Sequence, residues 1–178
     1  MIQKITSANT SINCTKLPAI YNKIDFSNFI PGFYLLDYGC GKYNNAKDYI
    51  YSSEIKGNWF GYDPFNRSEE ENKRSYYRHY ECIVCSNVLN VISDINILFE
   101  TIKKIIDRAD NDTKIFITIY EGDKTGVGKI TKKDCYQRNE IISKYLEYCN
   151  IVSSKKNFVI KKGVITNCPE YIKWRNDL

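Results

Sequence analysis

The sequence of 178 residues predicts a single α/β domain with a mostly parallel sheet and an antiparallel hairpin near its C-terminal end. Short apolar runs of strand length alternate with stretches in which apolar residues recur every three or four positions. This alternation is typical of strand–helix–strand units. The length suits one buried core rather than two ordinary domains. We divide the domain 1–178 into an N-terminal arm (1–31), a core (32–120) and a C-terminal part (121–178).

The first elements are marked by turn chemistry at their ends. A short helix is expected around residues 17–24, because a proline occupies its first turn, where a missing N–H costs least. Residues 34–36 have the apolar character of a buried parallel strand, and residues 45–55 can form a helix with one apolar side. A second strand over 58–62 ends where Pro64 prevents further pairing.

The middle of the chain contains the most regular helix pattern. Residues 68–77 are highly charged and predict a solvated helix, and residues 81–86 form a strand-like run. Ser93 is a good helix cap, and beyond it apolar residues recur at three- and four-residue intervals to position 106. Residues 110–112 predict a turn, after which residues 114–120 alternate β-branched and aromatic side chains as a strand.

The C-terminal part predicts one helix and a hairpin. Residues 131–134 have capping-box-like spacing before a helix that runs to about Tyr148. The runs 158–161 and 164–166 predict two strands that turn near Gly163.

The composition favours a reducing compartment. Seven cysteines, an odd number, are scattered without a disulfide framework, and the N-terminal residues do not resemble a signal peptide, so we expect a cytoplasmic protein. The apolar runs are far shorter than the roughly twenty residues of a membrane span, so no membrane association is expected. The net charge of +5 is a mild excess that is compatible with a nucleic-acid partner without requiring one.

Metal binding is not expected. Cys82 and Cys85 have the spacing of half a zinc site, but side chains three apart in a strand point to opposite faces. His79 is the single histidine, which excludes histidine-cluster chemistry.

Residues 33–42 are the most informative stretch, because an apolar run ends at Asp37 and is followed by Gly39 and Gly41. Closely spaced glycines allow a tight turn in which backbone approaches a ligand. A dinucleotide site is disfavoured, because Asn44 replaces the third glycine of its motif and a carboxylate would repel a pyrophosphate. S-adenosylmethionine carries a sulfonium and an ammonium, which a carboxylate stabilises, so the sequence predicts this cofactor.

Ligands bind beyond the carboxyl ends of the strands in such sheets. Four unusual segments follow predicted strands and should therefore converge on one edge: residues 37–43, 63–66, 86–90 and 121–129.

Two of these segments resemble motifs of class I S-adenosylmethionine-dependent methyltransferases. Leu35-Leu36-Asp37-Tyr38-Gly39-Cys40-Gly41 resembles their glycine loop, and Gly61-Tyr62-Asp63-Pro64 resembles their second-strand acidic turn. The resemblance covers roughly residues 33–120 and implies a Rossmann-like methyltransferase sheet with a cofactor-binding core. In that family the loop approaches the methionine part of the cofactor and the second acid holds the ribose hydroxyls.

The segment from Cys85 to Leu89 resembles the family's fourth-strand segment, which lies beside the donor methyl. Phe65 follows the acidic turn, where its ring can pack on adenine. The cofactor-binding residues predicted from these segments are Asp37, Tyr38, Gly39, Cys40, Gly41, Asp63, Pro64, Phe65, Ser86, Asn87 and Val88.

The sequence departs from the family pattern at two places. Tyr43 stands where the family has a third loop glycine, which could narrow the pocket. Only 17 residues separate Asp63 from Glu81, so the third strand of the sheet is expected to be shortened or missing, and no adenine contact from its end is assigned.

A narrower resemblance involves three short segments. Residues 87–92, 131–137 and 15–18 are similar to methyltransferases associated with DNA phosphorothioation systems.

The loop 121–129 is not a phosphate loop, because Asp123 replaces its first glycine and Lys129 is followed by isoleucine. A glycine-hinged loop on the substrate side and an ordinary surface connection are equally favoured. Glu121 and Asp123 are candidates for orienting or deprotonating the methyl acceptor, and Asn87 for aligning it.

Two functions remain open. The first is a methyltransferase with a nucleic-acid or small-molecule acceptor; the second is a non-catalytic S-adenosylmethionine-binding accessory or regulatory module. Residues 76–80, with Arg67, Lys73 and Arg74 upstream, interleave aromatic and basic side chains as nucleic-acid-binding segments do. A solvated helix end is the commoner explanation of that pattern. The sequence does not indicate an oligomeric state.

Overall fold

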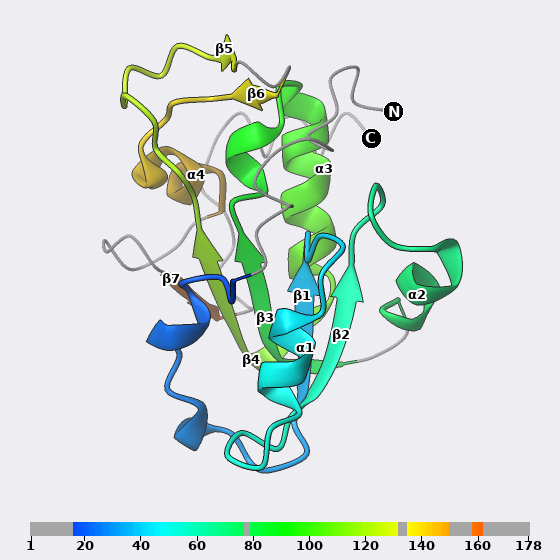
Figure 1. Cartoon of the computed structure of the whole chain (residues 1–178). Helices are drawn as coiled ribbons and strands as arrows, with labels where there is room; N and C mark the ends of the chain where they lie inside the picture. Colours follow the sequence, from blue (N-terminus) through cyan, green and yellow to red (C-terminus); the bar gives the residue numbers. More distant parts are fainter. Residues whose placement is uncertain (1–15, 77–78, 132–134, 150–157, 162–178) are drawn as a thin grey trace.

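A computed structural model describes residues 16–76, 79–131, 135–149 and 158–161 (Figure 1). Five strands form one sheet in the order β2-β1-β3-β4-β7. The first four are parallel to their neighbours, and β7 pairs antiparallel with β4. Their bounds are β1 Tyr34–Tyr38, β2 Asn58–Tyr62, β3 Tyr80–Ser86, β4 Ala109–Thr118 and β7 Phe158–Lys161. The predicted α/β fold with a mostly parallel, Rossmann-like sheet is confirmed.

Helices and the N-terminal arm cover both faces of this sheet. The α-helices are α1 Asn45–Ile50, α2 Glu69–Arg74, α3 Ile95–Ile106 and α4 Ile142–Cys149. In Figure 1 α1 lies in front of the sheet and α3 behind it. Ile50 of α1 packs with Tyr21, Leu35 and Val84 in one apolar cluster, whereas α3 contributes to a second cluster that contains Leu36. The alternation of residues along β1 therefore divides the core into two layers.

Helix α3 confirms the periodic stretch of the sequence, but its cap lies one residue later than predicted. Asp94, not Ser93, is the N-cap, and its carboxylate accepts from the backbone N–H groups of Asn96 and Ile97 at 2.8 and 3.3 Å. Aspartate satisfies the free N–H groups of a first turn as well as serine does.

The segment between β2 and β3 contains no strand in the residues that the structure describes, so the shortened region predicted from the sequence is seen here. It holds α2, which begins with a capping box between Ser68 and Glu71. The i,i+4 pairs Lys73–Glu69 and Arg74–Glu70 line its exposed surface. The prediction of a solvated helix is confirmed, and β2 is one of the two edge strands of the described sheet.

Three local predictions in the arm and the core differ from the structure in type or length. The short helix expected over residues 17–24 is a turn followed by a three-residue 3₁₀ helix, Tyr21–Lys23. Helix α1 stops at Ile50, because the chain turns back there and Gly57 N–H donates to the carbonyl of Ile50 at 2.9 Å. The residues 110–112 belong to β4, which extends along β3 past the irregular pairing near Tyr80.

The C-terminal part also differs from the prediction. Helix α4 begins only at Ile142, because a two-stranded antiparallel ribbon, β5 (Lys129–Ile130) with β6 (Tyr136–Gln137), precedes it. Figure 1 places this ribbon beyond the carboxyl ends of the parallel strands. The predicted second hairpin strand, 164–166, lies outside the described residues.

Cys82 and Cys85 are fully buried in the two different apolar clusters, as expected for opposite faces of a strand. Within the described ranges, no group of three acidic, histidine or cysteine side chains is placed to hold a metal ion. No described helix combines the length and apolar character needed to span a membrane.

Candidate functional site

The loop after β1 is a tight turn that only glycine permits. Gly39 and Gly41 have φ angles of +80° and +68°, values that side chains rarely adopt. A Cβ atom on Gly39 would lie 2.1 Å from Cγ2 of Val88. The N–H groups of Gly39 and Cys40 donate to the carbonyl of Tyr62 at 2.7 and 3.3 Å. The loop is therefore held against the end of β2 and the segment after β3.

Asp63, at the end of β2, organises the neighbouring turns. Its Oδ2 accepts from Gly41 N–H at 2.9 Å, while Oδ1 accepts from the N–H groups of Phe65 and Asn66 at 2.9 and 3.0 Å. Asn72 of α2 bonds both the N–H and the carbonyl of Asp63. Since a carboxylate oxygen offers about two acceptor positions, Oδ2 retains one for a further donor.

Arg67 fixes the far side of the same loop, a role that sequence reasoning missed. Its Nε donates to the carbonyl of Gly41 and its Nη2 to that of Tyr43, both at 2.7 Å. The guanidinium lies 5.5 Å from the ring of Trp59 and only 7% of the side chain is exposed. Arg67 is thus a structural clamp on the loop. The position of Arg67, four residues after Asp63 of the acidic turn, was the only signal that the sequence offered.

Asp37 is a buried carboxylate without an ion-pair partner among the described residues. It is 4% exposed, and Nε1 of Trp59 donates to its Oδ2 at 3.4 Å. The hydroxyl of Tyr21 lies near it but outside hydrogen-bond geometry, although it is close enough to lower the pKa. Burial dominates and raises the pKa of Asp37 to about 6. A cation beside this carboxylate would offset the cost of burying it.

A cavity of about 780 Å³ lies between these elements. All of the cofactor residues predicted from the sequence line it: Asp37, Tyr38, Gly39, Cys40, Gly41, Asp63, Pro64, Phe65, Ser86, Asn87 and Val88. The carboxyl ends of β1, β2 and β3 therefore meet at one site, as the topology of a parallel sheet requires. The N-terminal arm closes one side with residues 16–19.

Helix α3 forms a wall of the cavity that the sequence did not indicate. Ile97, Thr101 and Lys104 lie on one side of the helix, since they are separated by four and three positions, and all three line the cavity. Lys104 forms an ion pair with Glu100 at 2.6 Å.

Asn87 occupies a left-handed backbone conformation at the rim of the cavity. Its φ is +57°, and its N–H donates to the carbonyl of Thr118 at 2.8 Å. Asparagine tolerates this region better than most residues. Ser86 is linked to Thr118 through their hydroxyl groups at 3.1 Å. The ends of β3 and β4 are thereby joined next to the predicted methyl-transfer position.

Glu121 and Asp123 do not line this cavity. Oε1 of Glu121 accepts from Ile142 N–H, the first residue of α4, at 3.1 Å. Asp123 accepts from the Thr125 hydroxyl at 2.7 Å and pairs with Lys129 at 2.9 Å. These bonds lower the pKa of Asp123 to about 2, which makes it a weak base. The structure therefore does not bring these two predicted catalytic residues to the cofactor residues.

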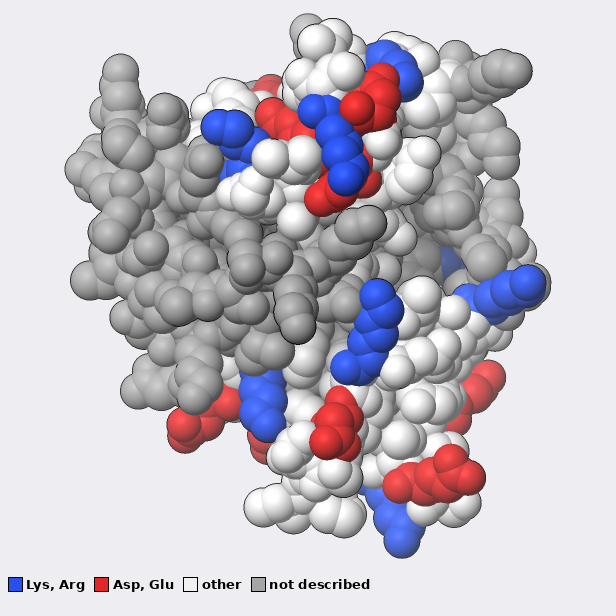
Figure 2. Space-filling model, turned by 90° about the vertical axis from the view of Figure 1, so that its left-hand side faces the viewer, with Lys and Arg blue, Asp and Glu red and all other residues white. Residues whose placement is uncertain are grey.

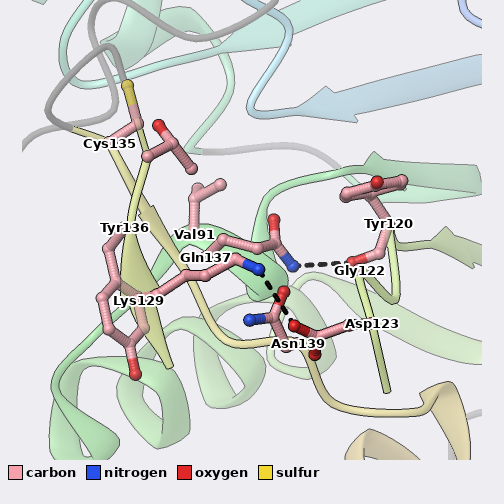
Figure 3. A pocket seen from close by; sticks show the side chains of 10 residues that line it. Val91, Tyr120, Gly122, Asp123, Lys129, Cys135, Tyr136, Gln137 and Asn139 are labelled. Carbon is pink, nitrogen blue, oxygen red and sulfur yellow. Dashed lines mark hydrogen bonds and ion pairs between the residues drawn. The ribbon is translucent and has the colours of Figure 1, made fainter. Parts of the chain in front are cut away.

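A second cavity of about 550 Å³ lies under the β5–β6 ribbon (Figure 3). Apart from Val91, which ends a 3₁₀ helix after β3, its lining residues come from the loop after β4, the ribbon and the segment that follows it: Tyr120, Gly122, Asp123, Lys129, Thr131, Cys135, Tyr136, Gln137 and Asn139. Val91 also lines the first cavity. The two cavities are therefore neighbours.

Comparison with known proteins found no family model and no curated protein that matches the chain. Among solved structures, the chain is similar to an S-adenosylmethionine-dependent methyltransferase from Clostridium acetobutylicum, with a TM-score of 0.49 and 14% identity over 81% of this chain and 89% of that one. A methyltransferase of the same description from Mesorhizobium loti has a TM-score of 0.43 and 12% identity, covering 74% of this chain and 77% of that one.

A third similar structure is phosphoethanolamine N-methyltransferase 2 from Haemonchus contortus, solved with phosphomonomethylethanolamine and S-adenosylhomocysteine. Its TM-score is 0.47 and its identity 19%, and the match covers 74% of this chain but only 35% of that one. With identities this low, none of the three structures establishes an activity, a substrate or a family for this chain.

Proposed function

We propose that this chain is an S-adenosylmethionine-dependent methyltransferase whose cofactor occupies the 780 Å³ cavity. The observation that carries the proposal is Asp37, a buried carboxylate that lines the cavity and forms no ion pair within the described residues, although the more distant charge of Arg67 lowers its pKa. A sulfonium or ammonium group is the complement that such a carboxylate lacks, whereas a pyrophosphate would be repelled.

The residues present fit this cofactor. Because Gly39 and Gly41 have no side chains, the loop presents its backbone to the cavity, and a ligand can approach that backbone closely. The free acceptor position on Oδ2 of Asp63 suits one ribose hydroxyl, and the ring of Phe65, which is 48% exposed, offers a flat surface for adenine. Asp63 therefore combines a ligand contact with its structural bonds.

When bound, S-adenosylmethionine would supply a methyl group: the carbon forms a bond with a lone pair of the acceptor, the carbon–sulfur bond breaks with its electron pair left on sulfur, and the acceptor's proton passes to water. The chain's own contribution is alignment, because transfer to a good nucleophile depends mainly on orientation. Asn87 lines the cavity beside Val88, and we propose that it aligns the reacting group of the acceptor with the methyl group.

Titration calorimetry of the full chain with S-adenosylmethionine and with S-adenosylhomocysteine tests the proposal. We expect both ligands to bind at one site. Asp37→Ala should lower the affinity for S-adenosylmethionine, which carries a sulfonium, more than the affinity for S-adenosylhomocysteine, whose sulfur is uncharged. Absence of binding by both ligands to the folded wild-type chain would refute the proposal.

A non-catalytic cofactor-binding module is the second candidate. The observation in its favour is that Glu121 and Asp123 are engaged in other bonds and lie outside the cofactor cavity. Transfer of a radiolabelled methyl group to DNA, RNA, protein or small-molecule pools separates the two functions. Transfer that is lost in Asp37→Ala would exclude the module, and binding without any transfer would favour it.

For the acceptor, we propose a small molecule ahead of a nucleic acid. Arg67, Lys73 and Arg74, which suggested nucleic-acid binding, form bonds or ion pairs within the protein. Figure 2 shows Lys and Arg side chains interspersed with Asp and Glu over the described part of one face. A continuous basic surface would be needed for phosphate contacts. Cys40 and Cys82 form no disulfide, which supports our proposal of a cytoplasmic location.

A further inference from the structure

We infer that the second cavity binds the methyl acceptor, and that this acceptor is a neutral, flat molecule that presents an N–H or O–H donor. This inference rests on the proposed function, because only a methyltransferase needs an acceptor, but the second cavity is separate from the cofactor cavity. Val91, which lines both cavities, ends the 3₁₀ helix Leu89–Val91 that follows the predicted methyl-transfer rim. A molecule in the second cavity is thus adjacent to the cofactor cavity.

Two glycines make room for the side chains that form this cavity. Gly122 has a φ of +59°, and a Cβ on it would lie 1.9 Å from Oδ1 of Asn139. A Cβ on Gly128 would lie 1.8 Å from the hydroxyl oxygen of Tyr136. The absence of a side chain at these two glycines therefore lets Asn139 and Tyr136 pack directly against the loop backbone. An ordinary surface connection would not need such close packing.

Asn139 supplies a buried hydrogen-bond acceptor that no described residue satisfies. The residue is fully buried, and its Nδ2 donates to the carbonyl of Val127 at 2.9 Å, which fixes the orientation of the amide. Its Oδ1 has no partner among the described residues. An unsatisfied buried acceptor costs about 1–3 kcal/mol. A ligand with an N–H or O–H group would remove that cost.

Three other polar side chains of the cavity are already engaged, and Figure 3 shows two of their interactions as dashed lines. Nε2 of Gln137 donates to the carbonyl of Tyr120 at 2.9 Å, and its Oε1 accepts from Asn90 at 3.0 Å. Lys129 and Asp123 neutralise each other at 2.9 Å. The cavity therefore offers no unbalanced charge, which favours a neutral ligand.

The aromatic residues of the cavity favour a flat ligand. The ring of Tyr120 is 65% exposed at the edge, and Tyr136 contributes a second, partly buried ring. Flat heterocycles pack well on such rings. A volume of about 550 Å³ lies within the range of small-molecule sites. These properties describe an aromatic amine, phenol or NH-heterocycle.

Indole and 1-methylindole are matched probes, because both are flat and neutral but only indole has an N–H donor. The full chain, first saturated with S-adenosylhomocysteine, is titrated with each probe and followed by amide chemical shifts. We expect indole to shift the amides of Tyr120, Gly122 and Asn139 and to bind about tenfold more tightly than 1-methylindole, the effect of about one hydrogen bond.

Tyr120→Ala should weaken indole binding several-fold, whereas Tyr51→Ala, which removes a 50% exposed tyrosine after α1, should not. Affinity for S-adenosylhomocysteine should be unchanged in both variants, which shows that they are folded. Equal binding of the two probes, or shifts confined to other regions, would overturn the inference. If S-adenosylhomocysteine does not bind, the proposed function fails, and the same indole titration of the free chain still decides whether the second cavity is a ligand site.

Discussion

Replacing Asp37 by asparagine should stabilise the free protein while it weakens cofactor binding. The carboxylate is 4% exposed, and burial raises its pKa from the ordinary value of 3.8 to about 6. Asparagine keeps an oxygen that can accept from Trp59, and its NH₂ group can donate to the nearby Tyr21 hydroxyl. The substitution therefore removes a buried charge without removing the polar contacts around it.

The magnitude follows from the shift in pKa. Between pH 4 and 6 the folded wild-type chain binds more protons at Asp37 than the unfolded chain, so its stability falls as the pH rises through this window. Above pH 6 the free-energy cost of burying the ionised carboxylate is fully present, and a shift of about two pKa units corresponds to about 3 kcal/mol of stability. Asp37→Asn should recover up to about 3 kcal/mol at pH 8 and almost nothing near pH 4.

Urea unfolding at pH 4 and pH 8 measures this difference. Asp112→Asn, a change at an exposed residue in β4, is the matched control and should have the same stability as the wild type at both pH values. In parallel, calorimetry at pH 8 should show that Asp37→Asn binds S-adenosylmethionine at least about tenfold more weakly, a loss of about 1.4 kcal/mol. An Asp37→Asn variant that is less stable than the wild type at pH 8, or equally stabilised at both pH values, would refute the reasoning.

Three further variants test how the loop is built. In thermal unfolding, Gly39→Ala should lower the free energy of unfolding by about 2–4 kcal/mol, because it adds both backbone strain and a clash with Val88 after β3. Gly32→Ala has a φ of +93° but open space around it, so it should add the strain alone and cost about 1–2 kcal/mol. Equal losses in the two variants would contradict the clash. Arg67→Lys should weaken the binding of S-adenosylhomocysteine several-fold in calorimetry, because lysine cannot donate to two carbonyls as the guanidinium does. The control Arg74→Lys should leave this affinity unchanged. Similar affinities of the two variants would show that the bonds of Arg67 to the loop are dispensable for binding. Ser68→Ala should destabilise the chain by about 1 kcal/mol in urea unfolding by removing the α2 cap, and an unchanged midpoint would argue that α2 contributes little to the cooperative fold.

The elements that the sequence predicted well are those with local causes. Strand β2 ends at Tyr62 because Pro64 and the acidic turn follow it, and α3 is visible in the spacing of its apolar residues. The glycine loop was recognisable because its positive φ angles demand glycine at Gly39 and Gly41. Each of these signals lies within a few residues of the feature it determines.

The features that could not be predicted depend on contacts between distant segments. Arg67 is 26 positions from Gly41, and only the folded sheet brings its guanidinium to the loop. Glu121 lies in a loop that suggested catalysis, yet it accepts from the first N–H of α4, whose start the sequence placed too early. Asn139 gave no signal, because its importance lies in a missing partner.

Within the described residues, β2 lies at one edge of the sheet, and this position has a consequence for self-association. A sheet edge with free backbone N–H and carbonyl groups is a template for pairing with another chain. Here the edge strand is only five residues long, Pro64 follows it closely, and α2 lies beside it (Figure 1). Asn72, the residue of α2 that bonds Asp63, would have to leave if a foreign strand took the place of that helix. Protection of the edge against aggregation and order in the cofactor loop are therefore maintained by the same short helix.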